Sequence, residues 1–304
     1  MGDPPEGKKA QAFVTDDVLR VQSRLTARDH TLLGWLADHG VLTTFQIAHA
    51  LFCSLGFAQR RLLTLYRVGL VDRFRPNKFD GGSYPYHYVL GLLGAEVVAA
   101  QRGDDPPRRS RIQARRRALT ARTNLDHLLG LNQFFTDLAG HARTHPPASL
   151  DRWWPETRCN EPWAFGTVGD LGSRIVRPDG HGIWTEPGPD GRTLLVPFFL
   201  EHDTGAEPLG QLIDKLGAYR RLATAGGPRW PVLFWLHSTR RQTNLHARLR
   251  EVGTPFPVAT AARDYAAELR LSPAERVWHL ADSVTEPIRL AQFAELFRLP
   301  PPAT

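Results

Sequence analysis

The sequence predicts a mixed α/β chain, α+β overall, in which two domains follow one another. Its 304 residues are enough for two ordinary domains, each with an apolar core of its own. Up to about residue 103, apolar residues recur at helical spacing and then form two short runs, whereas beyond about residue 150 short β-like runs alternate with helical ones. We expect a flexible leader over 1–24, a first domain over 25–103, an Arg-rich connector over 104–123, a second domain over 124–285 and a tail over 286–304.

Three helices are expected in the first domain. Thr26 has the side chain of an N-cap, and the first helix follows it with a row of leucines and ends at Gly40. The second helix is expected after the Thr43–Thr44 pair, and a turn at 53–56 separates it from a third helix over about 57–68. This third helix carries apolar residues for the core on one side and polar residues on the other.

A β-hairpin is expected next, with strands over 70–74 and 84–90 and a Gly-rich turn over 75–83. Three helices and a hairpin are the element order of a winged-helix domain, whose third helix enters the major groove of DNA while the hairpin touches the backbone or minor groove. The DNA contacts predicted on the third helix and the hairpin are Gln59, Arg60, Arg61, Thr64, Arg67, Arg73, Arg75 and Lys78. A domain that mediates protein contacts has the same element order and stays open as the alternative.

The charge balance favours a polyanionic partner. There are 38 Lys and Arg residues against 31 Asp and Glu residues, which gives a net charge of +7 and points to double-stranded DNA or, on charge alone, to an anionic membrane. The sequence has no run of about 18 apolar residues and its N-terminus is polar, so we expect a cytoplasmic protein without a membrane partner. Cys53 and Cys159 are too few for a disulfide framework and are expected to be reduced thiols.

The connector is the most basic stretch of the chain. Seven arginines lie between Arg108 and Arg122, and we expect them on a basic helix, either as a solvated face or as contacts to phosphates. A second helix, over about 124–145, then presents a broad apolar face.

The second domain is expected to be an α/β sheet with helical cover, because β-like runs alternate with helices. The expected strands are 150–156, 173–184, 193–203, 230–237 and 276–280, and the expected helices are 207–224, 241–252 and 259–269.

Acidic residues lie at the ends of two of these strands. Asp179 stands near the end of one strand, and Glu201 and Asp203 stand two residues apart on the next. Alternate strand residues share a face, so the three carboxylates can converge on one point. Three hard oxygen donors suit Mg²⁺ or Mn²⁺, which activates water and neutralises charge on a phosphodiester. The same pattern also fits turn and helix-capping chemistry, since Asp-Gly after Pro is a common turn sequence.

The next helix carries a polar row. Gln211, Lys215 and Tyr219 are spaced four residues apart and therefore lie on one side of it. Lys215 is informative because only four of the 38 basic residues are lysines, and an ammonium is a compact charge whose pKa can be tuned for water activation.

Two resemblances follow from these residues. Pro178-Asp179 followed by Glu201-His202-Asp203 resembles the PD-(D/E)XK nuclease pattern, with Asp203 standing where that family usually has lysine and Lys215 as its substitute on the next helix. The whole order, from the three helices through the Arg-rich connector to Glu201 and Lys215, resembles the replication-relaxation family of plasmids and mobile elements. The second resemblance implies a role in plasmid replication, transfer or control. The first implies a metal-dependent DNA endonuclease with Asp179, Glu201, Lys215, Gln211 and Tyr219 as catalytic residues.

Two other functions stay open beside the endonuclease. The first is a non-catalytic transcriptional or replication regulator in which the nuclease-like domain is inactive and serves as a dimerisation or accessory DNA-binding module; the replacement of lysine by Asp203 favours it. The second is an adaptor that recruits a relaxase or a replication initiator. His127 and His202 are left out of the metal set, because a histidine on an apolar element is more often a packed residue than a ligand.

Overall fold

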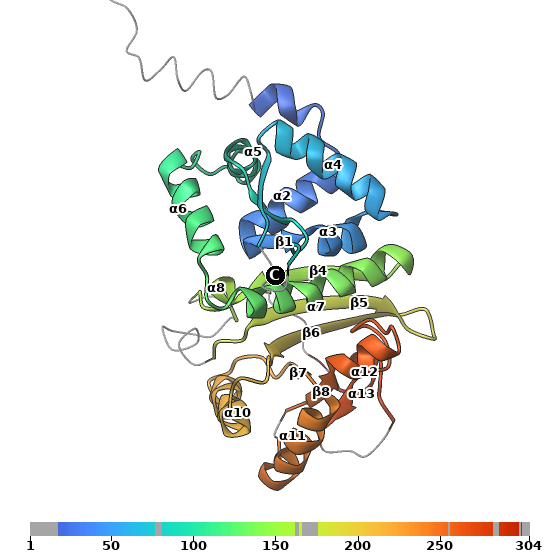
Figure 1. The fold of residues 1–304 in the computed structure, drawn as a ribbon. Helices are drawn as coiled ribbons and strands as arrows, with labels where there is room; N and C mark the ends of the chain where they lie inside the picture. Colours follow the sequence, from blue (N-terminus) through green and yellow to red (C-terminus); the bar gives the residue numbers. More distant parts are fainter. Residues whose placement is uncertain are drawn as a thin grey trace, which may run out of the picture. The chain divides into compact units, whose positions relative to one another are not determined.

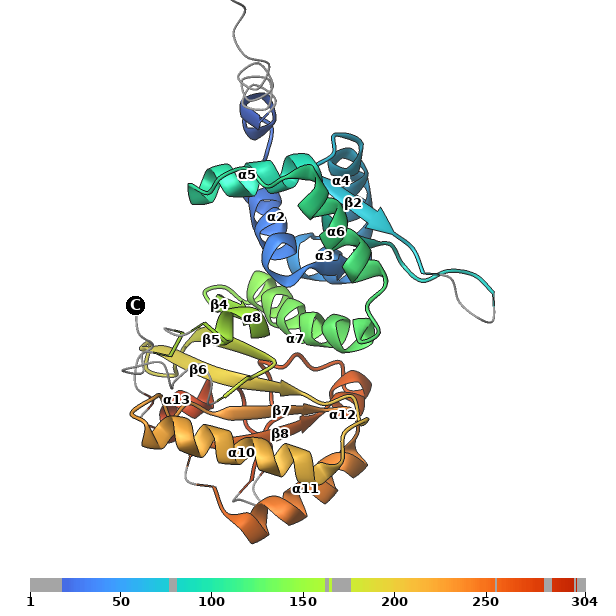
Figure 2. The same cartoon turned by 90° about the vertical axis from the view of Figure 1, so that its left-hand side faces the viewer.

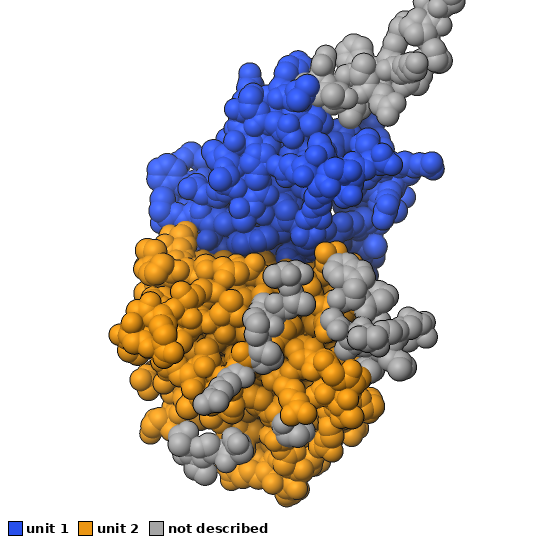
Figure 3. Space-filling model, turned by 180° about the vertical axis from the view of Figure 1, so that it is seen from behind, with its two compact units in different colours: residues 1–125 blue, residues 126–304 orange. Residues whose placement is uncertain are grey.

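A computed structural model describes residues 18–76, 81–161, 164–165, 176–254, 256–281, 286–297 and 299. The chain forms two compact units, Met1–Leu125 and Asp126–Thr304, here called unit 1 and unit 2 and coloured separately in Figure 3. The fold is mixed α/β, as the sequence predicts. None of the described helices is long and apolar enough to cross a lipid bilayer.

Unit 1 is a small three-stranded sheet with helices around it (Figure 1). Its elements are α2 (Ala27–His39), β1 (Val41–Thr43), α3 (Thr44–Leu51), α4 (Leu55–Arg67), β2 (Val71–Phe74), β3 (His87–Leu90), α5 (Leu92–Arg102) and α6 (Arg109–Thr120). The strand order is β1-β3-β2, and both pairings are antiparallel. The expected three helices and hairpin are therefore present in the expected order.

Capping boxes fix the starts of the first two of these helices. Thr26 Oγ1 accepts from the backbone N–H of Asp29, and the Asp29 carboxylate accepts from the backbone N–H of Thr26. Thr43 and Gln46 form the same reciprocal pair at α3. Each pair satisfies two backbone donors that a helix start otherwise leaves without partners.

Gly94 allows α5 to pack against the start of the hairpin. A Cβ atom at this position would lie 2.0 Å from the carbonyl oxygen of Leu70, which a folded chain does not tolerate. The glycine therefore permits an approach of helix to backbone that any side chain would block.

Three expectations for unit 1 need correction. Residues 18–22 are helical and Val18 is only 7% exposed, so the flexible leader does not extend to residue 24. The third helix begins at Leu55, because the Ser54 hydroxyl accepts from the backbone N–H of Phe57 and caps it two residues earlier than expected. The returning strand is confined to β3, since only His87–Leu90 pairs with β1 and β2.

Unit 2 is a six-stranded mixed sheet with helices on both faces. Its elements are α7 (Leu125–Thr144), β4 (Ser149–Pro155), α8 (Glu156–Cys159), β5 (Gly180–Pro187), β6 (Thr193–His202), α10 (Leu209–Thr224), β7 (Val232–Leu236), α11 (Thr239–Val252), β8 (Val258–Ala262), α12 (Arg263–Glu268), β9 (His279–Leu280) and α13 (Gln292–Leu296). The strand order is β4-β5-β6-β7-β8-β9.

The length of each connection decides whether the two strands that it joins pair parallel or antiparallel. A short turn joins β5 to β6, and the two pair antiparallel; α10 and α11 provide the crossovers that make β6, β7 and β8 parallel. Figure 2 shows α7 on one side of this sheet and α10 and α11 on the other. One core therefore lies under α7 around Phe134 and Trp278, and the other under α10 and α11 around Leu216 and Leu245.

Unit 2 differs from the expectations at its C-terminal end. The stretch expected as a helix over 259–269 is the strand β8 followed by the short helix α12. All five residues of β8 are buried in the sheet, and this packing overrides the helix preference of its alanines. The tail expected over 286–304 contains α13, whose Phe293 is fully buried, so Gln292–Leu296 belong to the domain.

The strand β4 is shifted by one residue from the expected 150–156, and the other strands are close to expectation but shorter. β5 begins at Gly180, and residues 176–179 of the stretch expected as a strand over 173–184 are irregular, while 173–175 lie outside the described residues. β9 comprises only two residues, in place of the expected 276–280.

The core under α7 predicts a contrast between two leucines of unit 2. Leu138 is completely buried, so Leu138→Ala is expected to lower the free energy of unfolding by roughly 2–5 kcal/mol. Leu269 is 50% exposed, and Leu269→Ala is expected to change it by less than about 0.5 kcal/mol. Urea denaturation followed by tryptophan fluorescence measures both, and equal losses would contradict this assignment of the core.

Candidate functional site

Asp179 and Glu201 meet at one end of the sheet of unit 2. Asp179 immediately precedes β5, and Glu201 is the last residue but one of β6. Gly180 pairs with Leu200 across the two antiparallel strands, so the next pair outward is formed by the two acidic residues. One oxygen of Asp179 accepts a hydrogen bond from the backbone N–H of His202 at 2.7 Å. The strand register therefore brings these two carboxylates together, as the sequence predicts.

Two side chains of α10 hold Glu201. Lys215 Nζ donates to Glu201 Oε2 at 2.8 Å, and the Tyr219 hydroxyl donates to Oε1 at 2.5 Å. The two residues are one helical turn apart and so reach the same side chain. Lys215, Glu201 and Tyr219 form what we call the Glu201 cluster.

Burial and charge set the protonation of the Glu201 cluster. Burial, together with the negative charge of Asp179, raises the pKa of Glu201 to about 7, although Lys215 opposes the shift. Burial works against the charge of Lys215, but the two carboxylates outweigh it and raise the pKa of the ammonium. Burial and Glu201 also raise the pKa of the Tyr219 hydroxyl well above its usual value. Lysine and tyrosine therefore stay protonated as donors, while Glu201 titrates near neutrality.

His127 of α7 is a neighbour of Asp179 that the sequence reasoning left out. Its Nε2 lies 3.5 Å from Asp179 Oδ1, and its ring meets the ring of His202 edge to face with centroids 5.2 Å apart. The hydrogen bond with Asp179 raises the pKa of His127. Burial raises the pKa of Asp179, but His127 and the other hydrogen-bond and charge partners outweigh it and lower the pKa overall. Nothing in the spacing of the sequence indicates that His127, at the start of α7, lies beside Asp179, which is about fifty residues later.

Gly130, which lies on the same helix as His127, leaves room for the side chain of His202. A Cβ atom at Gly130 would lie 2.4 Å from His202 Nε2. Burial lowers the pKa of His202 to about 3, so its imidazole is neutral and packs as an uncharged ring. His202 is only 3% exposed and packs against the ring of His127.

Asp203 does not join the other two carboxylates, and the expected three-carboxylate cluster is wrong. Arg241 of α11 binds both of its oxygens, with Nε 2.5 Å from Oδ2 and an Nη2 nitrogen 2.8 Å from Oδ1. The backbone carbonyl of Asp203 accepts from Arg263 at 2.9 Å. The strand β6 ends at His202, so the alternation that would place Asp203 beside Glu201 is lost at that point.

Gln211 is the one member of the expected polar row that stays apart. It lies in the first turn of α10, its side chain is exposed, and within the described residues it makes no side-chain hydrogen bond. Glu201 lies beside the second and third turns of the helix, which is why it meets Lys215 and Tyr219 only.

The residues at this strand end do not fit a divalent cation as they are arranged. Both oxygens of Glu201 are engaged by donors, one of them a cation, and Asp203 is neutralised by Arg241. In the part of the chain that the structure describes, no three His, Cys, Asp or Glu side chains are grouped so that they could hold a metal ion. Lys215 supplies the charge that a metal ion would otherwise supply.

The predicted DNA contacts of unit 1 fall into two groups. Most of those on α4 are exposed, and their apolar neighbours Ala58, Leu62 and Leu65 are buried. The predicted contacts on α4 that are exposed are Gln59, Arg60, Thr64 and Arg67, and Leu55, Phe57 and Tyr66 are exposed beside them. Arg61 is different, because its guanidinium binds the Asp29 carboxylate with atoms 2.5 and 2.9 Å apart. Arg61 therefore ties α4 to the capping box of α2, and we correct its assignment to a structural role.

The hairpin carries arginines stacked on tyrosines. The Arg73 guanidinium lies 4.5 Å from the ring of Tyr66 and 4.0 Å from the ring of Tyr86. Arg75 lies 5.0 Å from the Tyr86 ring, and its Nε donates to the carbonyl oxygen of Tyr84 at 2.6 Å. Lys78 lies outside the described residues. Stacking holds these two guanidinium groups in place while leaving their charges without an acidic partner among the described residues.

A protein-family model described as replication-relaxation matches residues 33–233. The match runs from α2 into β7 and includes Asp179, Glu201 and Lys215. Searches of curated proteins and of solved structures gave no match.

The Glu201 cluster predicts a pH-dependent loss of stability in Lys215→Met. The pKa of Glu201 is about 7 in the folded protein and near 4.5 in the unfolded chain. The folded state therefore binds the proton more tightly, and this contribution to stability is present below about pH 4.5 and is lost as the pH rises through 7. Without the cation, ionised Glu201 is buried and has no opposite charge beside it. We expect a loss of roughly 3–5 kcal/mol at about pH 8 and a clearly smaller one at about pH 5.5, from urea denaturation.

Matched variants isolate this effect. Glu201→Gln removes the titrating group, so the double variant Glu201→Gln/Lys215→Met is expected to lose much less stability at about pH 8 than Lys215→Met alone. Because the single and the double variant both lack Lys215, the comparison between them cancels the effect of this ammonium on the pKa values of His127 and Asp179. A loss in Lys215→Met that is the same at both pH values would refute the pairing.

Proposed function

Since the chain belongs to the replication-relaxation family, we propose that it is a DNA-binding protein in the replication of a plasmid or mobile element, which holds duplex DNA through unit 1. In this proposal unit 1 is a winged-helix domain, with α4 in the major groove and the β2–β3 hairpin on the backbone. The observation that carries it is the division of α4 into a buried apolar side and an exposed side with Gln59, Arg60, Thr64 and Arg67.

The chemistry of these exposed side chains suits DNA. Arginine forms paired hydrogen bonds with guanine edges and with phosphate oxygens, and glutamine does the same with adenine. Arg60 stacks on the exposed ring of Phe57, with its guanidinium 4.7 Å from the ring centroid, so its charge lies on the outside of the helix. On the hairpin, Arg73 and Arg75 offer two further cations for phosphate contacts.

We propose that unit 2 has a PD-(D/E)XK-like fold that acts in this protein as a non-catalytic module. Its order of one helix, three antiparallel strands, a crossover helix and a parallel strand supports the fold, and so does the place of Asp179 and Glu201 at adjacent strand ends. The engagement of Glu201 by Lys215 and Tyr219, and of Asp203 by Arg241, supports the absence of metal-dependent chemistry. Accessory DNA contact and dimerisation are the two roles that this module would then fill.

A metal-dependent endonuclease is the second candidate, and one observation favours it. Lys215 lies 2.8 Å from a carboxylate at the strand end where the nuclease pattern has its lysine. Because the donor set does not fit a divalent ion, we derive no catalytic step for it.

DNA binding is tested with a labelled duplex of about 30 base pairs and the full-length protein over a range of salt concentrations. We expect affinity to fall steeply with salt, and Arg60→Gln/Arg67→Gln to weaken binding by about tenfold or more at about 0.1 M salt, because each lost phosphate contact lowers the salt slope by about 0.9. Arg248→Gln/Arg250→Gln removes the same charge from exposed positions of α11 and serves as the control. Weak binding that does not respond to salt would instead favour an adaptor that recruits a relaxase or an initiator.

Cleavage is tested on supercoiled and linear DNA with Mg²⁺ or Mn²⁺. We expect bound DNA to remain intact, and Asp179→Ala and Lys215→Ala to leave this result unchanged. Metal-dependent nicking that disappears in both variants would overturn the non-catalytic assignment and establish the endonuclease.

A further inference from the structure

The basic helix α6 carries more charge than unit 1 neutralises. Five of its 12 residues are arginines and none is acidic. Its packing on unit 1 uses only two large apolar side chains, Ile112 and Leu119, both half-buried, and no residue of the helix is fully buried. A helix of this composition gains little from core packing, so its arginines have another use.

Specific contacts fix α6 to the sheet and to α2. Arg116 forms an ion pair with Asp72 of β2, and Arg115 donates to the carbonyl oxygen of Ala37. The Leu119 side chain lies against Gly40, 3.1 Å from where a Cβ atom would stand. The helix is therefore a firmly placed part of unit 1 and holds its outer side chains in a defined direction.

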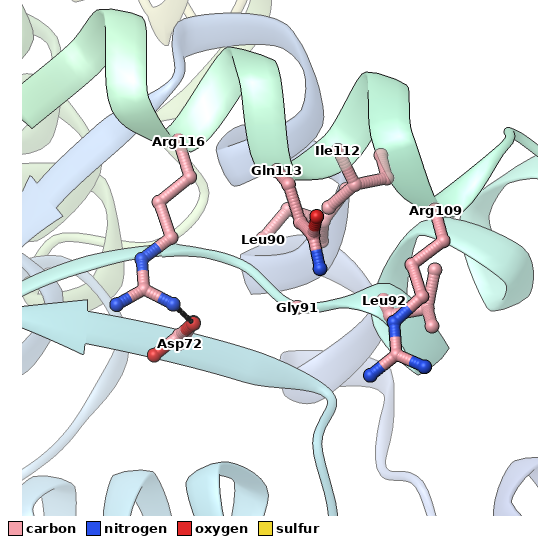
Figure 4. A pocket seen from close by; sticks show the side chains of 8 residues that line it. All are labelled: Asp72, Leu90, Gly91, Leu92, Arg109, Ile112, Gln113 and Arg116. Carbon is pink, nitrogen blue, oxygen red and sulfur yellow. Dashed lines mark hydrogen bonds and ion pairs between the residues drawn. The ribbon is translucent and has the colours of Figure 1, made fainter.

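One row of polar side chains runs along α6 beside the hairpin. Arg109, Gln113, Arg117 and Thr120 fall at positions i, i+4, i+8 and i+11, which is one side of a helix, and Arg116 stands next to them. Arg109, Gln113 and Arg116 help to line a hollow of ≈ 200 Å³ between α6 and the strands of the hairpin, seen in Figure 4. A second hollow continues the row at Gln113, Arg116, Arg117 and Thr120.

Most of the charge in this row is open to a ligand. Arg109 and Arg117 are exposed, and neither has an acidic partner in the ranges that the structure describes. Arg116, which stands next to the row, forms an ion pair with Asp72 in the hollow (Figure 4). A polyanion laid along the row would neutralise this positive charge.

We propose that the row formed by Arg109, Gln113, Arg117 and Thr120 binds the phosphate backbone of duplex DNA next to the segment held by α4 and the hairpin. This rests on the proposed function of unit 1 and adds a second contact surface to it. From Arg109 to Arg117 the helix rises about 12 Å, which covers roughly three phosphate steps of one strand at about 3.4 Å each. Arginine, glutamine and threonine are all common donors to phosphate oxygens.

The position of the row beside the hairpin favours DNA over an acidic protein. The hollow is bounded by β2 at Asp72, and the next residue of that strand, Arg73, belongs to the proposed hairpin contact. Successive residues of a strand point to opposite faces, so Arg73 and the hollow lie on the two faces of β2, and a duplex at the hairpin edge would contact both. Asp72, paired with Arg116, sets the limit of the surface on the inner side.

The test compares Arg109→Gln and Arg117→Gln with Arg111→Gln in the full-length protein, using a labelled random-sequence duplex of about 30 base pairs. Arg111 is exposed on the opposite side of the same helix, so its substitution removes an equal charge from outside the row. We expect each variant in the row to weaken binding roughly 8-fold at about 0.1 M salt and to lower the salt slope by about 0.9, whatever the DNA sequence. Arg111→Gln is expected to change affinity less than about twofold.

The possible outcomes separate this inference from the proposed function. If Arg60→Gln/Arg67→Gln weakens binding but Arg109→Gln and Arg117→Gln behave like Arg111→Gln, the row is not a DNA contact, although unit 1 binds DNA. If the wild type shows no salt-dependent binding to duplex DNA, the proposed function itself fails. If labelled polyglutamate binds the wild type and loses affinity in the row variants while DNA binding stays unchanged, the row is a site for an acidic protein and our assignment is overturned.

Discussion

The buried carboxylate of Glu201 is the constraint on which the functional end of unit 2 depends. Only 1% of this residue is exposed, and an ionised carboxylate out of water costs several kcal/mol unless opposite charge and hydrogen bonds compensate. Lys215 and Tyr219 provide that compensation from α10, which in turn fixes the distance of the helix from β6. Asp179 is held on the neighbouring strand by the backbone of His202, so the strands and the helix are locked together by one set of polar contacts.

The strand ends of unit 2 and the outer helix sides of unit 1 differ in how far their charges are neutralised by neighbours. At the strand ends of unit 2, Glu201 faces Lys215, Asp179 faces His127, and Asp203 faces Arg241, so each carboxylate is matched by a nitrogen base or a cation. In unit 1, the arginines on the outer sides of α4 and α6 have few acidic neighbours among the described residues. A surface that keeps its positive charge binds polyanions, and an internally neutralised cluster stabilises a fold. This contrast supports the proposed DNA binding by unit 1.

Local patterns in the sequence predict local structure well in this chain. The caps at Thr26 and Thr43 mark the first two helices, and the four-residue spacing of Lys215 and Tyr219 places them on one side of α10, where both reach Glu201. The predictions that are wrong concern residues whose contacts lie far away in the sequence. Arg61 is 32 residues from Asp29, and nothing near it indicates that pairing. β8 forms because a sheet surrounds it, which its alanines do not reveal.

The absence of a metal site at the strand ends is most directly tested by titrating the full-length protein with Mn²⁺ and recording its electron paramagnetic resonance, with and without duplex DNA, beside Asp179→Asn. Lys215 is bound to Glu201 and Arg241 is bound to Asp203. We therefore expect no saturable binding of one Mn²⁺ per chain, and no difference between wild type and variant. Binding of one Mn²⁺ per chain that Asp179→Asn abolishes would contradict it, and would show that the Glu201 cluster opens to accept a metal ion.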